Sequence, residues 1–207
     1  TTGGENSSFG YQSLKANTTG AENTACGTYA LYSNTTAGYN TGVGGQALFT
    51  NTTGTRNVAV GYKALRLSTT ANDNTAIGYK SLEANTTGLE NTAVGSKALD
   101  ANTTGNYNSA VGVHALSGCT TGAQNTALGA YAMQVNTASN NTAVGYTALY
   151  VNTTGTSNTA LGKAALLVNT TGGYNTAIGA NALDSNTTSG GHVALGYNSL
   201  SANTTGS

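Results

Sequence analysis

The stretch that decides the fold runs from Asn57 to Asp73 and reads N-V-A-V-G-Y-K-A-L-R-L-S-T-T-A-N-D. The next seventeen residues, from Asn74, repeat it as N-T-A-I-G-Y-K-S-L-E-A-N-T-T-G-L-E, and the whole chain consists of such copies. We number the places of the unit one to seventeen from its first Asn. The glycine of place five returns every seventeen residues, except between Gly129 and Gly145, where one residue is missing. A short fixed period predicts a stack of coils.

Composition excludes several classes of function. The chain of 207 residues has seven basic and seven acidic residues, so its formal net charge is zero. Nucleic-acid binding needs clustered Lys and Arg, so we expect no nucleic-acid partner. No apolar run is long enough to span a membrane. The chain opens and closes inside a unit without a polar cap, so we expect residues 1–207 to be a single repetitive segment of a longer fibre.

Two apolar columns predict the core. Place four is mostly Val, Ile or Leu, and place nine is Leu in every copy except at Met133. The predicted core residues are Val60, Leu65, Ile77, Leu82, Val94, Leu99, Val111 and Leu116. The β-branched residues and interrupting glycines favour one short strand over places two to four and another over about places six to nine. The sequence therefore predicts an all-β, parallel β-solenoid of about twelve seventeen-residue coils.

The corners of each coil are predicted by glycine and asparagine. Glycine in place five allows a sharp bend, and the N-T-T-G of places twelve to fifteen is typical of a turn. Stacked Asn side chains can bond to one another in a ladder. The predicted turn residues are Gly61, Gly78, Gly95, Asn85 and Asn102. The N-T-T triplets are also acceptor sequences for N-glycosylation, which leaves a sugar coat as the alternative to the ladder.

Places six and ten vary freely, which indicates exposure to solvent. Exposed tyrosine is a natural contact residue in binding surfaces. The candidate contact residues are Tyr62, Tyr79, Tyr146, Tyr150 and Tyr197. One Val and one Leu per coil provide little apolar burial for the ordering of seventeen residues. The small Ala and Gly places would let chains approach one another closely, so we expect a homo-oligomer.

No catalytic, metal-binding or cofactor-binding site is predicted. Cys26 and Cys119 lie about five coils apart, too far for a disulfide within one chain. His114 and His192 are also far apart, and no pair of carboxylates recurs from coil to coil. We therefore expect a protein that is not an enzyme, with two free thiols and ordinary surface substitutions at the histidines.

The pattern N-T-A-V-G-Y-x-A-L resembles the repeats of YadA-like adhesin heads, and Asn74 to Gly78 and Asn175 to Gly179 carry it well. With its N-T-T-G turn, the unit also looks like the repetitive shafts of phage tail-fibre-like proteins. The resemblance covers the whole chain, although its seventeen-residue period is longer than that of the adhesin heads. It implies a left-handed β-roll of three chains, located outside the cell on a cell surface or virion. It also implies attachment to a cell-surface receptor or glycan.

Ice binding is the alternative function. Regular Thr columns on a flat solenoid face can order water, and Thr recurs in places two, thirteen and fourteen, as at Thr75, Thr86 and Thr87. Places thirteen and fourteen are adjacent and lie in a turn, so their side chains would not share one flat face. The competing interpretation is that these threonines bond the backbone of the turn.

Overall fold

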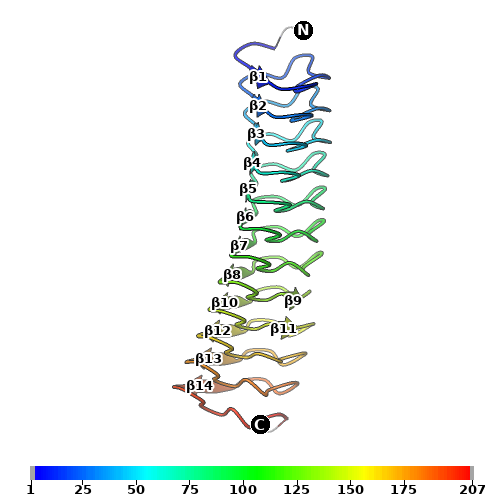
Figure 1. Cartoon of the computed structure of the whole chain (residues 1–207). Helices are drawn as coiled ribbons and strands as arrows, with labels where there is room; N and C mark the ends of the chain where they lie inside the picture. The colour runs from blue at the N-terminus through cyan, green and yellow to red at the C-terminus, as the bar shows by residue number, and fades with distance from the viewer. Residues whose placement is uncertain (1–2, 206–207) are drawn as a thin grey trace.

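The chain forms one elongated column of stacked coils (Figure 1). This computed structural model describes residues 3–205, of which none lies in a helix. It is a parallel β-solenoid of about eleven turns spaced seventeen residues apart, so the predicted all-β solenoid is confirmed. The chain passes from one end of the column to the other, and each coil contacts the coils next to it.

Twelve three-residue strands form a single parallel sheet along one side of the column (Figure 1). Their order in the sheet follows the chain. They are β1 (Ser7–Phe9), β2 (Thr24–Cys26), β3 (Thr41–Val43), β4 (Val58–Val60), β5 (Thr75–Ile77), β6 (Thr92–Val94), β7 (Ser109–Val111), β8 (Thr126–Leu128), β10 (Thr142–Val144), β12 (Thr159–Leu161), β13 (Thr176–Ile178) and β14 (Val193–Leu195). Each strand occupies places two to four of its coil, so identical places pair across the sheet.

The one short coil leaves this register intact. Thr126 of β8 pairs with Thr142 of β10, sixteen residues later, whereas every other neighbouring pair in the sheet is seventeen residues apart. The missing residue is absorbed in the turn on the opposite side. There the described residues form a second, two-stranded parallel sheet from β9 (Val135–Asn136) and β11 (Val151–Asn152). The sheet side of the coil is therefore constant, and the turn side accommodates changes in length.

The structure corrects half of the predicted core. The alanine of place three, as at Ala76 and Ala93, is fully buried, whereas Ile77 is 40% and Val111 37% exposed. Val60 and Val94 are half-buried on the same outer side. Successive side chains of a strand point to opposite faces, so an inward alanine in place three places both of its neighbours outward. The aliphatic column of place four therefore lies outside the solenoid, and the small alanines line its interior.

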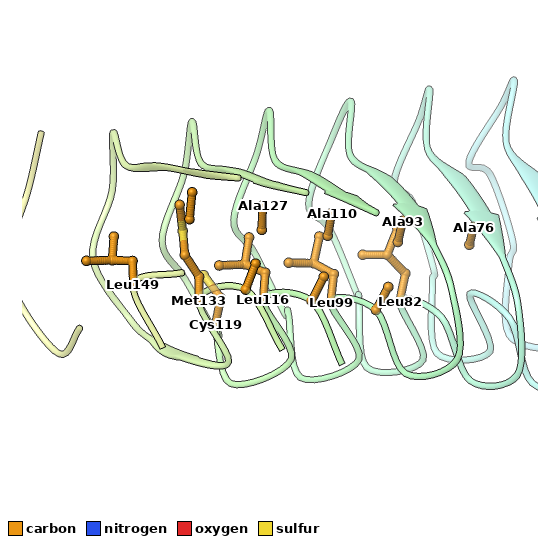
Figure 2. Close-up of a cluster of buried hydrophobic side chains, with 14 of the residues drawn as sticks. Ala76, Leu82, Ala93, Leu99, Ala110, Leu116, Cys119, Ala127, Met133 and Leu149 are labelled. Atoms are coloured by element: carbon orange, nitrogen blue, oxygen red, sulfur yellow. The ribbon is translucent and has the colours of Figure 1, made fainter. Parts of the chain in front are cut away.

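The leucine column of place nine fills the interior opposite these alanines. Its predicted members are all fully buried: Leu65, Leu82, Leu99 and Leu116. In Figure 2, leucines from one wall face alanines from the sheet across the interior, and this arrangement repeats along the column. The alanines of place eight, such as Ala98, are also fully buried. Each coil is thus thin, because one large side chain and two small ones span it.

The second predicted strand is not present. Places six to nine are turns, and the residues in places seven and nine have positive φ, as in Lys63 (60°) and Leu65 (48°). The Lys63 amide donates to the Gly45 carbonyl of the preceding coil, and the Leu65 amide donates to the Ser81 carbonyl of the following one. Alternation of backbone conformation therefore lets this segment bond to the coils on both sides without forming a regular strand.

Candidate functional site

The corner after each strand requires glycine. Gly61, Gly78 and Gly95 have φ between 133° and 136°, a region that other residues rarely adopt. A Cβ atom on Gly78 would lie 2.6 Å from the carbonyl oxygen of Gly95 in the next coil. The corner thus brings consecutive backbones too close for any side chain. The role expected for these three glycines in a turn agrees with their position.

A ladder of asparagines in place one runs along the interior next to the sheet. The Asn91 amide N–H and Nδ2 both donate to Asn74 Oδ1, at 2.9 and 3.2 Å, and Nδ2 also donates to the Gly105 carbonyl at 2.8 Å. Asn91 Oδ1 in turn accepts from the amide N–H and Nδ2 of Asn108. Every polar atom of this buried side chain is bonded, so the ladder fixes both the bend and the distance between coils.

A second ladder in place twelve stabilises the other bend. Asn102 Nδ2 donates to Asn85 Oδ1 at 2.8 Å and to the Gly105 carbonyl at 3.1 Å. The asparagines of this ladder with no solvent exposure are Asn34, Asn51, Asn85, Asn102, Asn136, Asn152, Asn169 and Asn186. A sugar on a buried Nδ2 would have to displace these bonds. Except for Asn136, which Ala138 follows, these asparagines begin acceptor sequences, and those sequences are therefore closed to glycosylation in the folded coil.

Threonines of place thirteen bond the backbone of the next coil. Thr86 Oγ1 donates to the Thr103 carbonyl at 3.0 Å, and Thr103 Oγ1 donates to the Thr120 carbonyl at the same distance. Their hydroxyl hydrogens are consequently used within the turn. Of the three Thr columns considered for ice binding, the one in place two, as at Thr75 and Thr92, lies on the sheet and points outward.

Two of the five candidate tyrosines stack on each other. The rings of Tyr62 and Tyr79 lie 6.0 Å apart and nearly parallel, and each is 47% exposed. The ammonium groups of Lys63 and Lys80 lie 5.1 and 5.7 Å from the ring centres of Tyr62 and Tyr79, respectively. Stacked rings flanked by cations form a firm, partly apolar platform on the surface.

The other three candidate tyrosines lie apart from this pair. Tyr146 is 54% exposed and meets the edge of Tyr131, whereas Tyr150 is half-buried and Tyr197 is 74% exposed near the last described coil. The five residues thus form no single site. Their spacing follows from the spacing of the coils that carry them.

Sequence reasoning missed an aromatic cluster in the first coils. Tyr32 and Phe49 stack at 5.2 Å, and Tyr29 packs edge-on against both at 5.6 and 6.2 Å. Tyr11 extends the cluster through Tyr29 at 5.5 Å. Places six, seven and ten of adjacent coils meet in this cluster. These contacts join different places of adjacent coils, so the residue pattern within any one place does not indicate them.

We call the outer side of the sheet, formed by places two and four of its twelve strands, the outward face. Place four on this face holds Phe9, Cys26, Val43, Val60, Ile77, Val94, Val111, Leu128, Val144, Leu161, Ile178 and Leu195. Place two holds Thr or Ser in ten of these strands and Val in the other two. Neither place carries a charged residue between Ser7 and Leu195. The outward face is therefore a long uncharged strip that is half aliphatic.

Charged residues pair along the column on its other sides. Arg56 and Asp73, both in place seventeen, contact at 2.6 Å, and Arg66 and Glu83, both in place ten, contact at 3.0 Å. The hydrogen bond from Arg56 lowers the pKa of the Asp73 carboxyl. These pairs are at least partly exposed, so each contributes little to stability. In each pair, residues of opposite charge nevertheless occupy the same place of consecutive coils, so stacking brings them together.

The two cysteines have opposite environments, and both are free thiols. Cys26 is exposed on the outward face, in place four of β2. Cys119 replaces the asparagine of place twelve and is fully buried, with Sγ 3.6 Å from the Gly122 carbonyl. Burial raises the pKa of the Cys119 thiol to about 11, which keeps it protonated and unreactive.

Comparisons of the chain with protein-family models, with curated proteins and with solved structures found no match. Within residues 3–205 there is no surface pocket and no cluster of three His, Cys, Asp or Glu side chains that could hold a metal ion. The same residues contain no helix with the length and apolar character needed to cross a membrane. The feature that recurs on the described surface is a set of columns, each formed by the same place of successive coils.

Proposed function

We propose that this chain is a structural segment of an extracellular fibre, which gives reach and carries attachment sites on a cell surface or virion. The observation that carries the proposal is the direction of its bonding. Backbone hydrogen bonds, two asparagine ladders and the pairing of charges all link one coil to the next along the axis. Material built this way transmits tension along its length and can be extended by adding units.

The proposed fibre contains several copies of the chain, three by the resemblance to adhesin heads. Attachment to a receptor or glycan uses the tyrosine columns, because aromatic side chains provide large, rigid contact areas. The Tyr62–Tyr79 platform is the best-formed candidate, since its rings are already stacked and half exposed. No catalytic step and no cofactor is part of the proposal.

Electron microscopy of the purified chain tests the structural part. Eleven spacings of ~4.8 Å predict a rod about 53 Å long for the twelve strands. A chain with the whole sequence repeated once in the same seventeen-residue phase should give a rod about twice as long. Round particles whose diameter grows in all directions would contradict the proposal.

Binding to glycan arrays and to cells tests the attachment part. The variant Tyr62→Ala with Tyr79→Ala should lose most of the binding of the parent chain, because it removes both rings of the platform. Tyr174→Ala is the matched control, since Tyr174 is 73% exposed and lies outside that stack. Equal binding by the double variant and the control would exclude the platform as the contact site.

One observation favours ice binding as the second candidate function. The Thr column of place two lies on a regular parallel sheet, with Thr75 and Thr92 in direct register and facing outward. Thermal hysteresis and ice shaping by the purified chain test this function. Substitution of Thr92 and Thr126 by Lys should abolish the activity if the outward face binds ice, whereas Thr87→Lys in the opposite turn should not.

A further inference from the structure

The outward face leaves a continuous aliphatic column uncovered in the single chain. In the middle of the column Ile77 is 40%, Leu128 48% and Leu161 44% exposed, although neighbouring coils already cover part of each side chain. The column holds Val, Ile or Leu in each of the ten sheet strands from β3 to β14, and it continues as Cys26 in β2 and Phe9 in β1. A contiguous apolar strip of this length is unusual for a surface that remains in water, and it indicates an interaction site.

We propose that the partner on the outward face is a second copy of this chain, packed along its length so that the aliphatic columns meet. The proposal rests on the proposed fibre and identifies the surface that holds its copies together. It also assigns a reason to the uniform Val, Ile and Leu of place four, which the interior of the single chain does not use.

The repeat of the face favours a copy of the same chain over an unrelated protein. Side chains of place four project once per coil, at the strand spacing of about 4.7–4.9 Å. A partner that fills the gaps between them over the whole strip must have the same spacing along its length. A second copy has that spacing throughout, and sheets pack face to face through such interdigitated side chains.

The chemistry of the face also permits self-association. No charged residue lies in places two or four from Ser7 to Leu195, so two copies brought together along this strip meet no like-charge repulsion within it. The charged pairs Arg56–Asp73 and Arg66–Glu83 lie in places seventeen and ten, which are not part of the strip. Threonine hydroxyls of place two can bond across the edge of the contact or remain in water.

The size of the face fits an association whose strength depends on length. Twelve strands spaced ~4.8 Å apart give a strip about 53 Å long, and with a width of about 10 Å it would bury roughly 1,000 Å² over two copies. That area lies below the roughly 1,200–2,000 Å² of stable protein interfaces and is typical of weak association. We therefore expect association that depends on concentration and becomes tighter in chains with more coils.

Sedimentation velocity and light scattering of matched variants test the proposal. Val94→Asn with Val111→Asn places two amides in the middle of the strip without disturbing a buried residue. The control, Val113→Asn with Val135→Asn, makes the same change at sites that are 44% and 43% exposed but lie outside the outward face. We expect the parent and the control to associate, and the strip variant to fall to the single-chain mass of 20.5 kDa.

A second measurement follows the exposed thiol. Cys26 is exposed in the single chain and lies in place four of β2, so contact between copies would cover its thiol. Labelling of Cys26 by a thiol reagent should slow several-fold as the concentration of the parent chain rises, and it should stay fast in the strip variant. The buried Cys119 should react slowly in every sample until the chain unfolds.

The outcomes separate this inference from the proposed function. If the chain associates but the strip variant associates equally and Cys26 labels at an unchanged rate, the outward face is not the contact, whereas a fibre built through another surface still stands. If the parent chain is a rod with a single-chain mass at every concentration, the inference is wrong. Thermal hysteresis from such a single chain would instead assign the outward face to ice.

Discussion

At the scale of single residues, the position of a side chain on the pleated strand decides its burial more than its hydrophobic character does. Ala93 is fully buried whereas Val94, larger and more apolar, is half-buried beside it on the outer side. The interior is so narrow that a leucine from the opposite wall already fills it, and only a methyl group fits on the strand side. Substitutions in the two apolar columns should therefore have very different costs.

Leu99→Ala should lower the free energy of unfolding by about 2–5 kcal/mol, because Leu99 is fully buried and its loss leaves a cavity. Val94→Ala should cost less than about 1 kcal/mol in the single chain, since its side chain lies on the outer side. Urea unfolding at a concentration where the chain is monomeric measures both. Equal costs would show that place four is part of the interior after all.

Asp100 gives a prediction for pH. Burial raises the pKa of its carboxyl, and His114 and Lys97 offset only part of that effect. An acid with a raised pKa in the folded state binds more protons folded than unfolded in the window between its two pKa values. Its contribution to stability therefore falls as pH rises through that window and remains reduced at neutral pH. Asp100→Asn should be more stable than the parent at pH 7.

The difference between Asp100→Asn and the parent should vanish below the ordinary Asp pKa of about 3.9, where the parent is protonated in both states. Urea midpoints at pH 7 and pH 3 provide the measurement. A variant that is no more stable than the parent at pH 7 would show that the burial of this carboxyl does not oppose folding.

At the scale of elements, the place-one ladder bonds each coil to the next beside the three-residue strands. Asn91→Ala removes the acceptor of the buried Asn108 amide N–H and the side-chain donor Nδ2 that bonds Asn74 Oδ1 and the Gly105 carbonyl. Unfolding free energy should fall by about 1–3 kcal/mol, since the Asn108 amide N–H is left buried without an acceptor. Thermal unfolding is the measurement, with the exposed Thr87→Ala as control. A loss no larger than that of the control would contradict a structural role for the ladder.

The elements also show what could be predicted from the sequence. The period and the glycine and asparagine corners predict the solenoid, because each requires a specific backbone conformation in every coil. The alternation in Thr-Ala-Val indicates a strand, but it does not say which side chains face inward. We predicted that Val94 lies in the interior, whereas the structure places Ala93 there. A strand over places six to nine was wrong because left-handed leucines such as Leu65 are rare and no local signal marks them.

The candidate contact surface was less predictable than the fold. Variability of place six correctly placed Tyr62 and Tyr79 outside, but whether two rings stack depends on which residues the next coil presents. The cluster of Tyr29, Tyr32 and Phe49 joins places seven and ten across two coils. Such contacts follow from the path of the turn, which the sequence pattern leaves open.

At the scale of the whole molecule, stability should increase with the number of coils. Deletion of residues 74–124, three complete units, joins place seventeen at Asp73 to place one at Asn125 and preserves every column. The shortened chain should fold, and its urea m-value should fall by about a quarter, because m follows the surface exposed on unfolding. Circular dichroism with urea titration measures this.

Deletion of residues 74–82 is the matched control for the loss of whole units. It removes fewer residues but shifts every later column by about half a coil, which places Glu83 where an interior asparagine belongs. The control should lose cooperative unfolding. Retained structure in the control, or its loss in the three-unit deletion, would contradict an architecture held together by neighbouring coils.

The single coil of sixteen residues has a consequence for how the chain finds its own alignment. Any strand could dock on a wrong neighbour one unit away and still satisfy the same ladders, since nearly all copies are interchangeable. The turn shortened at Asn136 differs from the others, and it is the one that pairs through β9 and β11 within the described residues. One irregular coil can therefore distinguish the correct pairing of coils from many equivalent incorrect pairings.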